Sequence, residues 1–273
     1  MITLAQLPAG HPGRALLTGR TPWFACQGDP RFSYGLYVPR GGEELEQAAL
    51  LVVVHGTDRY AQLDLDSWAT FAEQHNLVVA APLFPAGING PDDLDNYKTI
   101  ESGGVRYDLT LFGMLDEVRL RWGISTERFF LAGHSGGGQF ALRMLLLHPQ
   151  RLSGVVISAP GRITLADPGS AWPRGTGDVA ERFGITIDNA AIARTPALLT
   201  IGSEDRGADD LAAQHDPSQD GFGVTRLERF ATLAEHLRAL GADPAVHIAP
   251  GGTHSDPATI PVVQEFISQR LPS

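Results

Sequence analysis

Short apolar runs alternate along the chain with longer segments in which apolar residues recur every three or four positions. Residues 49–54 (ALLVVV) and 77–83 (LVVAAPL) are apolar throughout, which indicates strands buried on both faces. Residues 105–122 carry apolar side chains at helical spacing instead. The same patterns predict strands over residues 128–132, 152–159, 197–202 and 245–249, and helices over 66–75, 139–148, 224–240 and 258–271.

This alternation predicts an α/β fold, with a mostly parallel sheet of about eight strands and helices on both faces. Residues 14–38 hold two or three short runs broken by Gly and Pro, which indicates antiparallel strands at a sheet edge. Residues 161–196 break the alternation with a Gly- and Pro-rich sequence, and a segment of that length inside a compact domain is usually functional. We therefore predict one domain over residues 1–273, with 161–196 as a lid or binding insert after the sixth strand; the alternative for this insert is a plain surface connection.

Composition and charge exclude several classes of function. The chain has 273 residues, 43% of them hydrophobic, and a net charge of −10. No basic run is present, so we expect no nucleic-acid partner. The longest apolar run, residues 48–54, is far too short to span a membrane. The single cysteine, Cys26, excludes an internal disulfide, and the first residues do not resemble a secretory signal. A cytoplasmic protein is the expectation.

The sequence AGHSGGG, at residues 132–138, carries the first sign of chemistry. Gly133, Ser135 and Gly137 form a G-x-S-x-G pattern, preceded by a predicted strand and followed by a predicted helix. A serine on such a sharp strand-to-helix turn projects its hydroxyl above the sheet edge, and the turn closes only if its neighbours are very small. We predict Ser135 as a nucleophile, against the alternative of a glycine-rich turn without chemistry.

A serine hydroxyl needs a base, and an acid group must orient that base. His254 lies in a Gly-rich loop between the last predicted strand and the last predicted helix, where active sites of open α/β sheets gather. Asp205 follows the predicted strand 197–202 and is the first choice for the acid. Glu204 is the fallback, and Asp209 and Asp210 are further candidates. His134 is expected to be a packing residue.

An acyl-transfer site also needs hydrogen-bond donors for the oxyanion. The amide of Gly136 directly follows the serine, and the amide of Thr57 lies in the loop HGTDRY after the strand 49–54. We predict these two amides as the donors. His55, in the same loop, is expected to be structural, with its ring bonded to loop backbone.

Four motifs, HGT, GHSGG, IGSED and GGTHSD, resemble those of α/β-hydrolases in their chain order, over about residues 30–271. More loosely, the region from GHSGGGQF onward and the insert with AWP resemble bacterial polyhydroxybutyrate-depolymerase-like hydrolases. The resemblance implies an α/β-hydrolase fold and a Ser135–His254–Asp205 triad that works without a metal or an organic cofactor. The segment DDLDNY, residues 92–97, lacks the glycine and closing glutamate of a calcium loop.

The sequence therefore predicts a serine hydrolase that cleaves small or medium-sized carboxylic esters through an acyl-enzyme. Tyr60, Phe84 and Trp172 are the residues predicted to contact the substrate. Hydrolysis of another acyl bond, in a polyhydroxyalkanoate oligomer, a lactone, a thioester or an amide, remains an alternative, and so does a non-catalytic ligand receptor on the same fold. A small-molecule ester is the expected partner, and self-association into a homodimer is left open.

Overall fold

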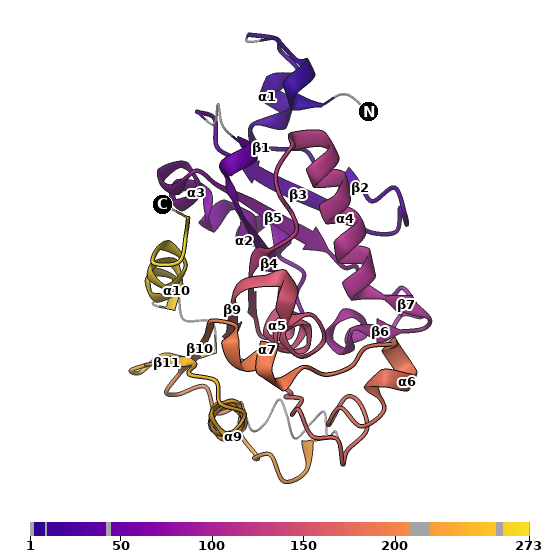
Figure 1. Cartoon of the computed structure of the whole chain (residues 1–273), viewed down its shortest axis with the longest axis vertical. Coiled ribbons are helices and arrows are strands. Elements are labelled where there is room, and N and C mark those ends of the chain that lie inside the picture. Colours follow the sequence, from indigo (N-terminus) through magenta and orange to yellow (C-terminus); the bar gives the residue numbers. More distant parts are fainter. Residues whose placement is uncertain (1–2, 9, 42–44, 208–218, 255–258, 273) are drawn as a thin grey trace. The chain divides into compact units, whose positions relative to one another are not determined.

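A computed structural model describes residues 3–8, 10–41, 45–207, 219–254 and 259–272. The chain divides into two compact units, the first made of residues 1–131 with 271–273 and the second of residues 132–270. Figure 1 shows the elements of both units in sequence colours. The expectation of a single domain stays a prediction.

Unit 1 is built on a small sheet that mixes antiparallel and parallel pairs. Strand order is β1-β3-β5-β4, with β2 beside β3. The pairs of β3 with β1, β2 and β5 are antiparallel, whereas β4 and β5 are parallel. This confirms the antiparallel edge predicted within residues 14–38. The strands are β1 (Gly19–Arg20), β2 (Phe24–Ala25), β3 (Ser33–Val38), β4 (Ala49–Val54) and β5 (Leu77–Leu83), and a hairpin of β6 (Glu101–Ser102) and β7 (Val105–Arg106) forms a separate pair.

Helices of unit 1 differ from the sequence prediction at two places. The helix predicted over 66–75 is two helices that meet at Trp68, and the first of them starts at Ala61. The helix predicted from residue 105 starts at Tyr107, because Val105 and Arg106 pair in β7. The helices are α1 (Arg14–Leu17), α2 (Ala61–Ser67), α3 (Ala69–His75) and α4 (Tyr107–Trp122), with 3₁₀ turns η1 (Leu4–Gln6), η2 (Leu45–Gln47) and η3 (Asn96–Thr99).

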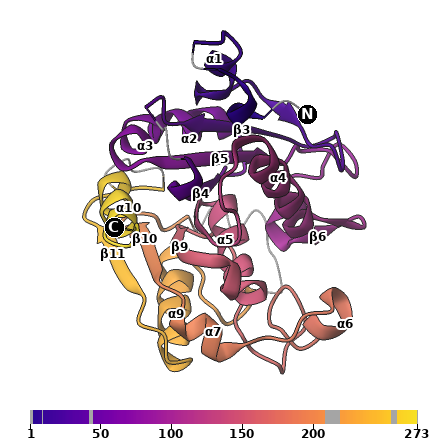
Figure 2. The same cartoon turned by 45° about the horizontal axis from the view of Figure 1, so that its top comes forward.

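The chain enters unit 2 within β8 (Phe129–His134). Strand order there is β8-β9-β10-β11, and β10 is parallel to both β9 and β11. Helix α5 packs on β9, and all of its residues are buried. Helix α9 packs on β10, and α10 lies beside β10 and β11 (Figure 2). The remaining strands are β9 (Leu152–Ser158), β10 (Ala197–Gly202) and β11 (Ala245–Ala249); the helices are α5 (Gly136–Leu147), α6 (Val179–Phe183), α7 (Asn189–Arg194), α9 (Arg226–Ala239) and α10 (Thr259–Ser268), with a 3₁₀ turn η4 (Pro149–Arg151).

A capping box fixes the start of α9. The Thr225 hydroxyl accepts a hydrogen bond from the Glu228 N–H over 3.2 Å, and the Glu228 carboxylate accepts one from the Thr225 N–H over 3.0 Å. These two bonds satisfy amides that a helix N-terminus otherwise leaves unpaired. The helix therefore begins at Arg226, the next residue along the chain.

Candidate active site

A sharp turn joins β8 to α5 and carries Ser135. This residue has φ 55° and ψ −112°, a conformation that favours glycine and costs a residue with a side chain roughly 1–3 kcal/mol. Its N–H donates to the carbonyl oxygen of Ser158 over 2.9 Å, and its carbonyl accepts from the Gln139 N–H over 3.1 Å. Both bonds hold the strained turn that the G-x-S-x-G pattern predicts.

Glycines let the strand and the helix approach each other at this turn. A Cβ on Gly133 would lie 2.1 Å from the carbonyl oxygen of Gly137, and a Cβ on Gly138 would lie 2.5 Å from that of Ser158. Neither position tolerates a side chain. Gly138 lies outside the five-residue pattern, and the unbroken run of three glycines was the sequence signal for it.

His254 lies in the loop after β11 and contacts both of the other predicted residues. Its Nε2 is 2.9 Å from the Ser135 Oγ, and its Nδ1 is 2.7 Å from an oxygen of the Asp205 carboxylate. The structure thus brings together three side chains from three separate loops, all in unit 2. Asp256, expected to cap the helix after this loop, lies outside the described residues.

Asp205, rather than Glu204, faces His254. The Asp205 side chain is 1% exposed, whereas that of Glu204 is 56% exposed and lies 4.0 Å from the Arg206 guanidinium. The N–H of Asp205 donates to the carbonyl oxygen of Gly202, which turns the chain directly after β10. Asp209 and Asp210, the other acid candidates, lie outside the described residues.

The second oxygen of the Asp205 carboxylate accepts a hydrogen bond from Arg226 over 3.1 Å. Burial alone would raise the pKa of the carboxyl, but the His254 hydrogen bond and the charges of His254 and Arg226 outweigh burial and lower that pKa. Asp205 is therefore ionised at neutral pH and can only accept hydrogen bonds. The proton of a neutral His254 ring accordingly sits on Nδ1, and the lone pair of Nε2 faces the serine hydroxyl. Sequence reasoning missed Arg226, because an arginine in the first turn of a helix carries no distinguishing pattern.

His134 packs against His254, as expected for a packing residue. The two ring centroids are 4.7 Å apart, and the Nδ1 of His134 is 3.2 Å from the Ser158 Oγ. That oxygen in turn accepts from the Thr200 hydroxyl over 2.8 Å. Burial first, and the neighbouring His254 second, lower the pKa of His134 to about 4. A neutral ring therefore lies behind His254 over the ordinary pH range.

Comparison with known proteins places this geometry in context. No protein-family model matches the chain, and no curated protein matches it. Solved structures do match. Poly(aspartic acid) hydrolase-1 from Sphingomonas sp. KT-1 is 24% identical at a TM-score of 0.70, over 86% of this chain and 92% of that one. LpqC, a poly(3-hydroxybutyrate) depolymerase from Bordetella parapertussis, is 24% identical at a TM-score of 0.70, over 89% of this chain and 85% of that one.

An S-formylglutathione hydrolase from Agrobacterium tumefaciens is 18% identical at a TM-score of 0.61, over 88% of this chain and 90% of that one. The chain has the α/β-hydrolase fold. The parallel pairs β4–β5, β9–β10 and β10–β11, the antiparallel strands around β3 and the helices packed on them agree with this fold.

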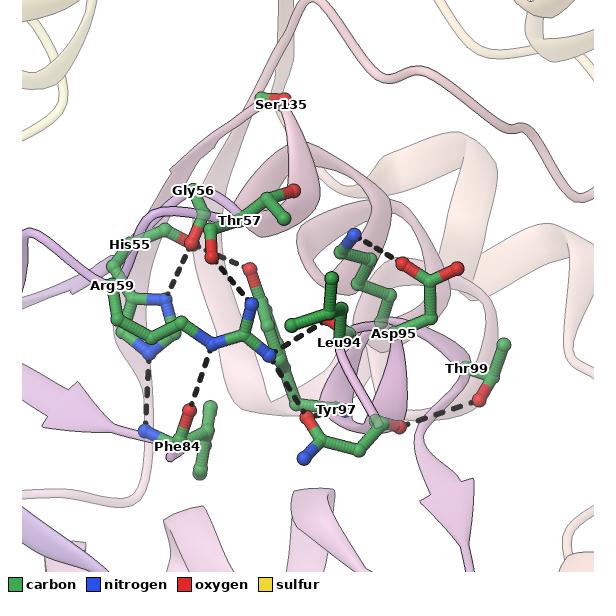
Figure 3. Close-up of polar contacts among 12 residues, drawn as sticks. His55, Gly56, Thr57, Arg59, Phe84, Leu94, Asp95, Tyr97, Thr99 and Ser135 are labelled. Carbon is green, nitrogen blue, oxygen red and sulfur yellow. Dashed lines mark hydrogen bonds and ion pairs between the residues drawn. The ribbon is translucent and has the colours of Figure 1, made fainter. Parts of the chain in front are cut away.

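Within this α/β-hydrolase fold, the loop after β4 in unit 1 carries the second predicted oxyanion donor, Thr57. His55 opens the loop with its ring buried (Figure 3). The Nδ1 of His55 lies 2.8 Å from the Gly56 carbonyl oxygen, and its Nε2 accepts from the Phe84 N–H over 3.0 Å. These contacts confirm that His55 bonds loop backbone. Burial lowers the pKa of His55 to about 4, so its ring is neutral.

Two of the three residues predicted to contact the substrate, Phe84 and Trp172, are buried, and their contact with a substrate stays a prediction. Phe84 has no exposed surface, because its ring packs against Phe32 and Tyr107 edge-on and stacks on Tyr97. Trp172 is 6% exposed and packs edge-on against Phe183, with ring centroids 5.1 Å apart. Both aromatic rings therefore pack against other rings in the interior.

Tyr60, the third residue predicted to contact the substrate, directly precedes α2 and is 62% exposed. Its role stays a prediction.

The insert is tied to the rest of unit 2 by buried polar contacts. The Arg143 guanidinium, on α5, donates to the Thr164 hydroxyl over 2.9 Å, and the Gln219 side chain bonds both backbone groups of Ile163. Within the insert itself, the N–H of Trp172 donates to the Asp178 carboxylate over 2.6 Å. The predicted lid role of residues 161–196 stays a prediction.

Two further observations concern the part of the chain that the structure describes. No group of three or more His, Cys, Asp or Glu side chains within it is arranged to hold a metal ion. None of its helices combines the length and the apolar character that a bilayer crossing requires.

Proposed function

We propose that this chain is a serine hydrolase that cleaves carboxylic esters of small or medium size through an acyl-enzyme. One observation supports this proposal above all: the His254 ring lies between the Ser135 Oγ and the Asp205 carboxylate, at 2.9 and 2.7 Å. A base within hydrogen-bond reach of a nucleophile, itself oriented by a third group, is the arrangement that activates a serine. The proposed function assigns Ser135 as the nucleophile, His254 as the base and Asp205 as the orienting acid.

The proposed reaction proceeds in two halves. The Nε2 of His254 takes the hydroxyl proton as the Ser135 Oγ attacks the ester carbonyl carbon, and the carbonyl electron pair moves onto oxygen. The imidazolium then gives its proton to the departing alkoxide, the ester C–O bond breaks, and an acyl-serine remains. A water molecule repeats the sequence, loses its proton to His254 and releases the acid. Asp205 stays ionised throughout and stabilises the imidazolium.

Two backbone amides are proposed to donate to the oxyanion. Gly136 is the first residue of α5, where N–H groups have no acceptor within the helix. Thr57 is the proposed second donor, from the loop that follows β4. Loss of one such donor typically lowers kcat by about a hundred- to a thousandfold.

Esters are the proposed substrates because the acyl-enzyme route needs only the three side chains and two amides above. The names of the similar structures include a polyester depolymerase, a poly(aspartic acid) hydrolase and an S-formylglutathione hydrolase. The same chemistry would cleave oligomers of hydroxyalkanoates, lactones, thioesters or amides. These acyl bonds are therefore included in the test as alternative substrates.

The test measures hydrolysis of p-nitrophenyl esters of increasing acyl length by the full chain, with a lactone, a thioester, an anilide and a hydroxybutyrate oligomer alongside. A fluorophosphonate probe then reports covalent labelling, located by peptide mass spectrometry. Ser135→Ala and His254→Ala are each expected to lower kcat by about a millionfold. Ser67→Ala is the matched control, since its hydroxyl, at the end of α2, donates to the Asp64 carbonyl oxygen of its own helix.

A hydrolase is expected to be labelled at Ser135 and to lose turnover in both variants while Ser67→Ala keeps it. Turnover that survives in Ser135→Ala would contradict the nucleophile assignment. A protein that binds these compounds without turnover or labelling would instead be a receptor on the hydrolase fold. Preference for a lactone, thioester, amide or oligomer over every simple ester would keep the mechanism and replace the substrate class.

A further inference from the structure

The Arg59 side chain bonds several backbone oxygens in unit 1. Its Nε donates to the Phe84 carbonyl oxygen over 3.3 Å. Its Nη2 donates to the Leu94 carbonyl oxygen over 2.7 Å and to the Asn96 Oδ1 over 3.3 Å. Its Nη1 donates to the carbonyl oxygen of Thr57. Figure 3 shows the guanidinium at the centre of these contacts. One side chain therefore links the loop after β4 to the loop after β5.

The backbone of Arg59 is strained in the same loop. Its φ is 59°, in the left-handed region that residues with a Cβ seldom adopt. The Arg59 N–H donates to the Gly56 carbonyl oxygen over 3.2 Å, which closes a tight turn over residues 56–59. Glycine would adopt this conformation more easily, so the conformation alone does not explain an arginine here, whereas the contacts of its side chain do.

The turn fixes the direction of one particular amide. The Gly56 carbonyl oxygen accepts from the Arg59 N–H and from the His55 Nδ1, which carries the proton because Nε2 accepts from an amide. In a trans peptide the C=O and the following N–H point in opposite directions. The N–H of Thr57 therefore points away from both groups. Among the residues that the structure describes, it has no hydrogen-bond acceptor.

Tyr97 supports the turn from beneath. Its hydroxyl donates to the His55 carbonyl oxygen over 2.9 Å, and its ring lies edge-on to the His55 ring at 4.9 Å. The Arg59 guanidinium lies over the Tyr97 ring, with its Cζ 5.2 Å from the ring centroid. Tyr97 is fully buried. The carbonyl oxygens of residues 55, 56 and 57 are all held, and their peptide planes with them.

We propose that Arg59 is a positioning residue that holds the Thr57 N–H in a fixed, outward direction for the oxyanion. This inference rests on the proposed function, in which that amide is the second donor. The planar guanidinium offers five N–H groups in a fixed fork and can bond several carbonyl oxygens at once, which a lysine ammonium matches poorly. A donor that is already oriented needs no reorganisation during the reaction, and this is the source of its rate effect.

Arg59→Gly is the first test, because glycine removes the guanidinium and also relieves the backbone strain at φ 59°. We expect kcat toward the best ester to fall about a hundredfold, with KM within about twofold because the oxyanion forms only after binding. The affinity of an aryl boronate, which mimics the tetrahedral state, should fall in parallel with kcat. The melting temperature should shift by less than about 4 °C, and millimolar guanidinium should restore part of kcat.

The matched control is Asn76→Gly. Asn76 ends α3 with φ 46°, so glycine relieves the same kind of backbone strain there. It should keep kcat, KM and boronate affinity. Arg59→Lys is the second variant, in case Arg59→Gly does not fold, and it should recover only part of the lost kcat. A kcat within threefold of wild type in either Arg59 variant would overturn the proposal. So would a loss that appears equally in KM, or one that leaves boronate affinity unchanged.

Failure of the proposed function gives a different result. In that case wild type would neither hydrolyse any of the acyl substrates nor react with fluorophosphonate, and the role of Arg59 would fall with it. An active wild type with unaffected Arg59 variants would overturn only the positioning role.

Discussion

Gly202→Ala tests whether close packing at the end of β10 sets the position of His254. Gly202 ends the strand directly before the turn with Asp205. A Cβ there would lie 2.2 Å from the Gly252 carbonyl oxygen and 2.6 Å from that of Thr253. Both oxygens belong to the backbone of the loop that carries His254, and backbone cannot rotate out of the way as a side chain can.

The displacement follows from these distances. A Cβ essentially never approaches another heavy atom within 3.0 Å, so the Gly252 carbonyl must retreat by about 0.8 Å. That carbonyl also accepts from the Glu204 N–H over 2.8 Å, which ties the His254 loop to the Asp205 turn. A similar movement of His254 would lengthen its 2.9 Å contact with Ser135 beyond hydrogen-bond reach. A misplacement of about 1 Å costs about a hundredfold in rate, and overpacking costs about 1–3 kcal/mol of stability.

The assay compares kcat/KM for a p-nitrophenyl ester and the urea-unfolding free energy of Gly202→Ala with those of wild type. Gly113→Ala is the matched control, because Gly113 lies within α4 with nothing within 4 Å of an added Cβ. That variant should keep its activity and gain up to about 1 kcal/mol from better helix propensity. The reasoning is refuted if Gly202→Ala keeps kcat/KM within threefold of wild type.

Two further predictions concern buried ionisable side chains, Arg226 and His55. Arg226→Met removes the ion pair with the buried Asp205 carboxylate and should lower the free energy of unfolding at pH 7 by about 3 kcal/mol. Arg206→Met, at an exposed pair with Glu204, should cost at most about 1 kcal/mol. Equal effects of the two variants in urea denaturation would contradict the role of Arg226. Burial lowers the pKa of His55 from 6.5 to about 4. As pH falls, the His55 ring is therefore protonated in the unfolded state before it is protonated in the folded state. The free energy of unfolding should fall by about 3 kcal/mol between pH 6.5 and 4 from this residue. NMR titration should find the His55 ring neutral down to about pH 5, and a midpoint near 6.5 would contradict its buried, neutral state.

Much of the fold and the central side chains could be predicted from the sequence because they leave local patterns. Apolar runs such as 49–54 and 77–83 become buried strands with little change of bounds. Ser135 stands out because its turn requires glycines, and His254 because it follows a strand in a Gly-rich loop. The contacts of His55 with loop backbone were also predictable, since other histidines were better placed to act as the base.

Other features depended on contacts between distant segments, and no local pattern records them. Phe84 and Trp172 looked like pocket residues because large aromatic side chains next to loops suit a pocket as well as a core. Their burial among neighbouring aromatic rings becomes visible only in the folded structure. Arg59 and Arg226 are indistinguishable in sequence from solvated arginines, because their role arises from oxygens that folding brings to them.

The amino-acid sequence by itself determined the alternation of strands and helices, the strained serine turn and the chain order of serine, acid and histidine, because backbone geometry and hydrophobic period act over a few neighbouring residues. Tertiary structure alone decided which of two adjacent carboxylates, Glu204 or Asp205, turns inward to His254. It also decided which arginines hold the site and which aromatic rings are core. Those choices depend on the direction of a side chain relative to segments that are mostly tens of residues away along the chain, and that direction exists only after the chain has packed.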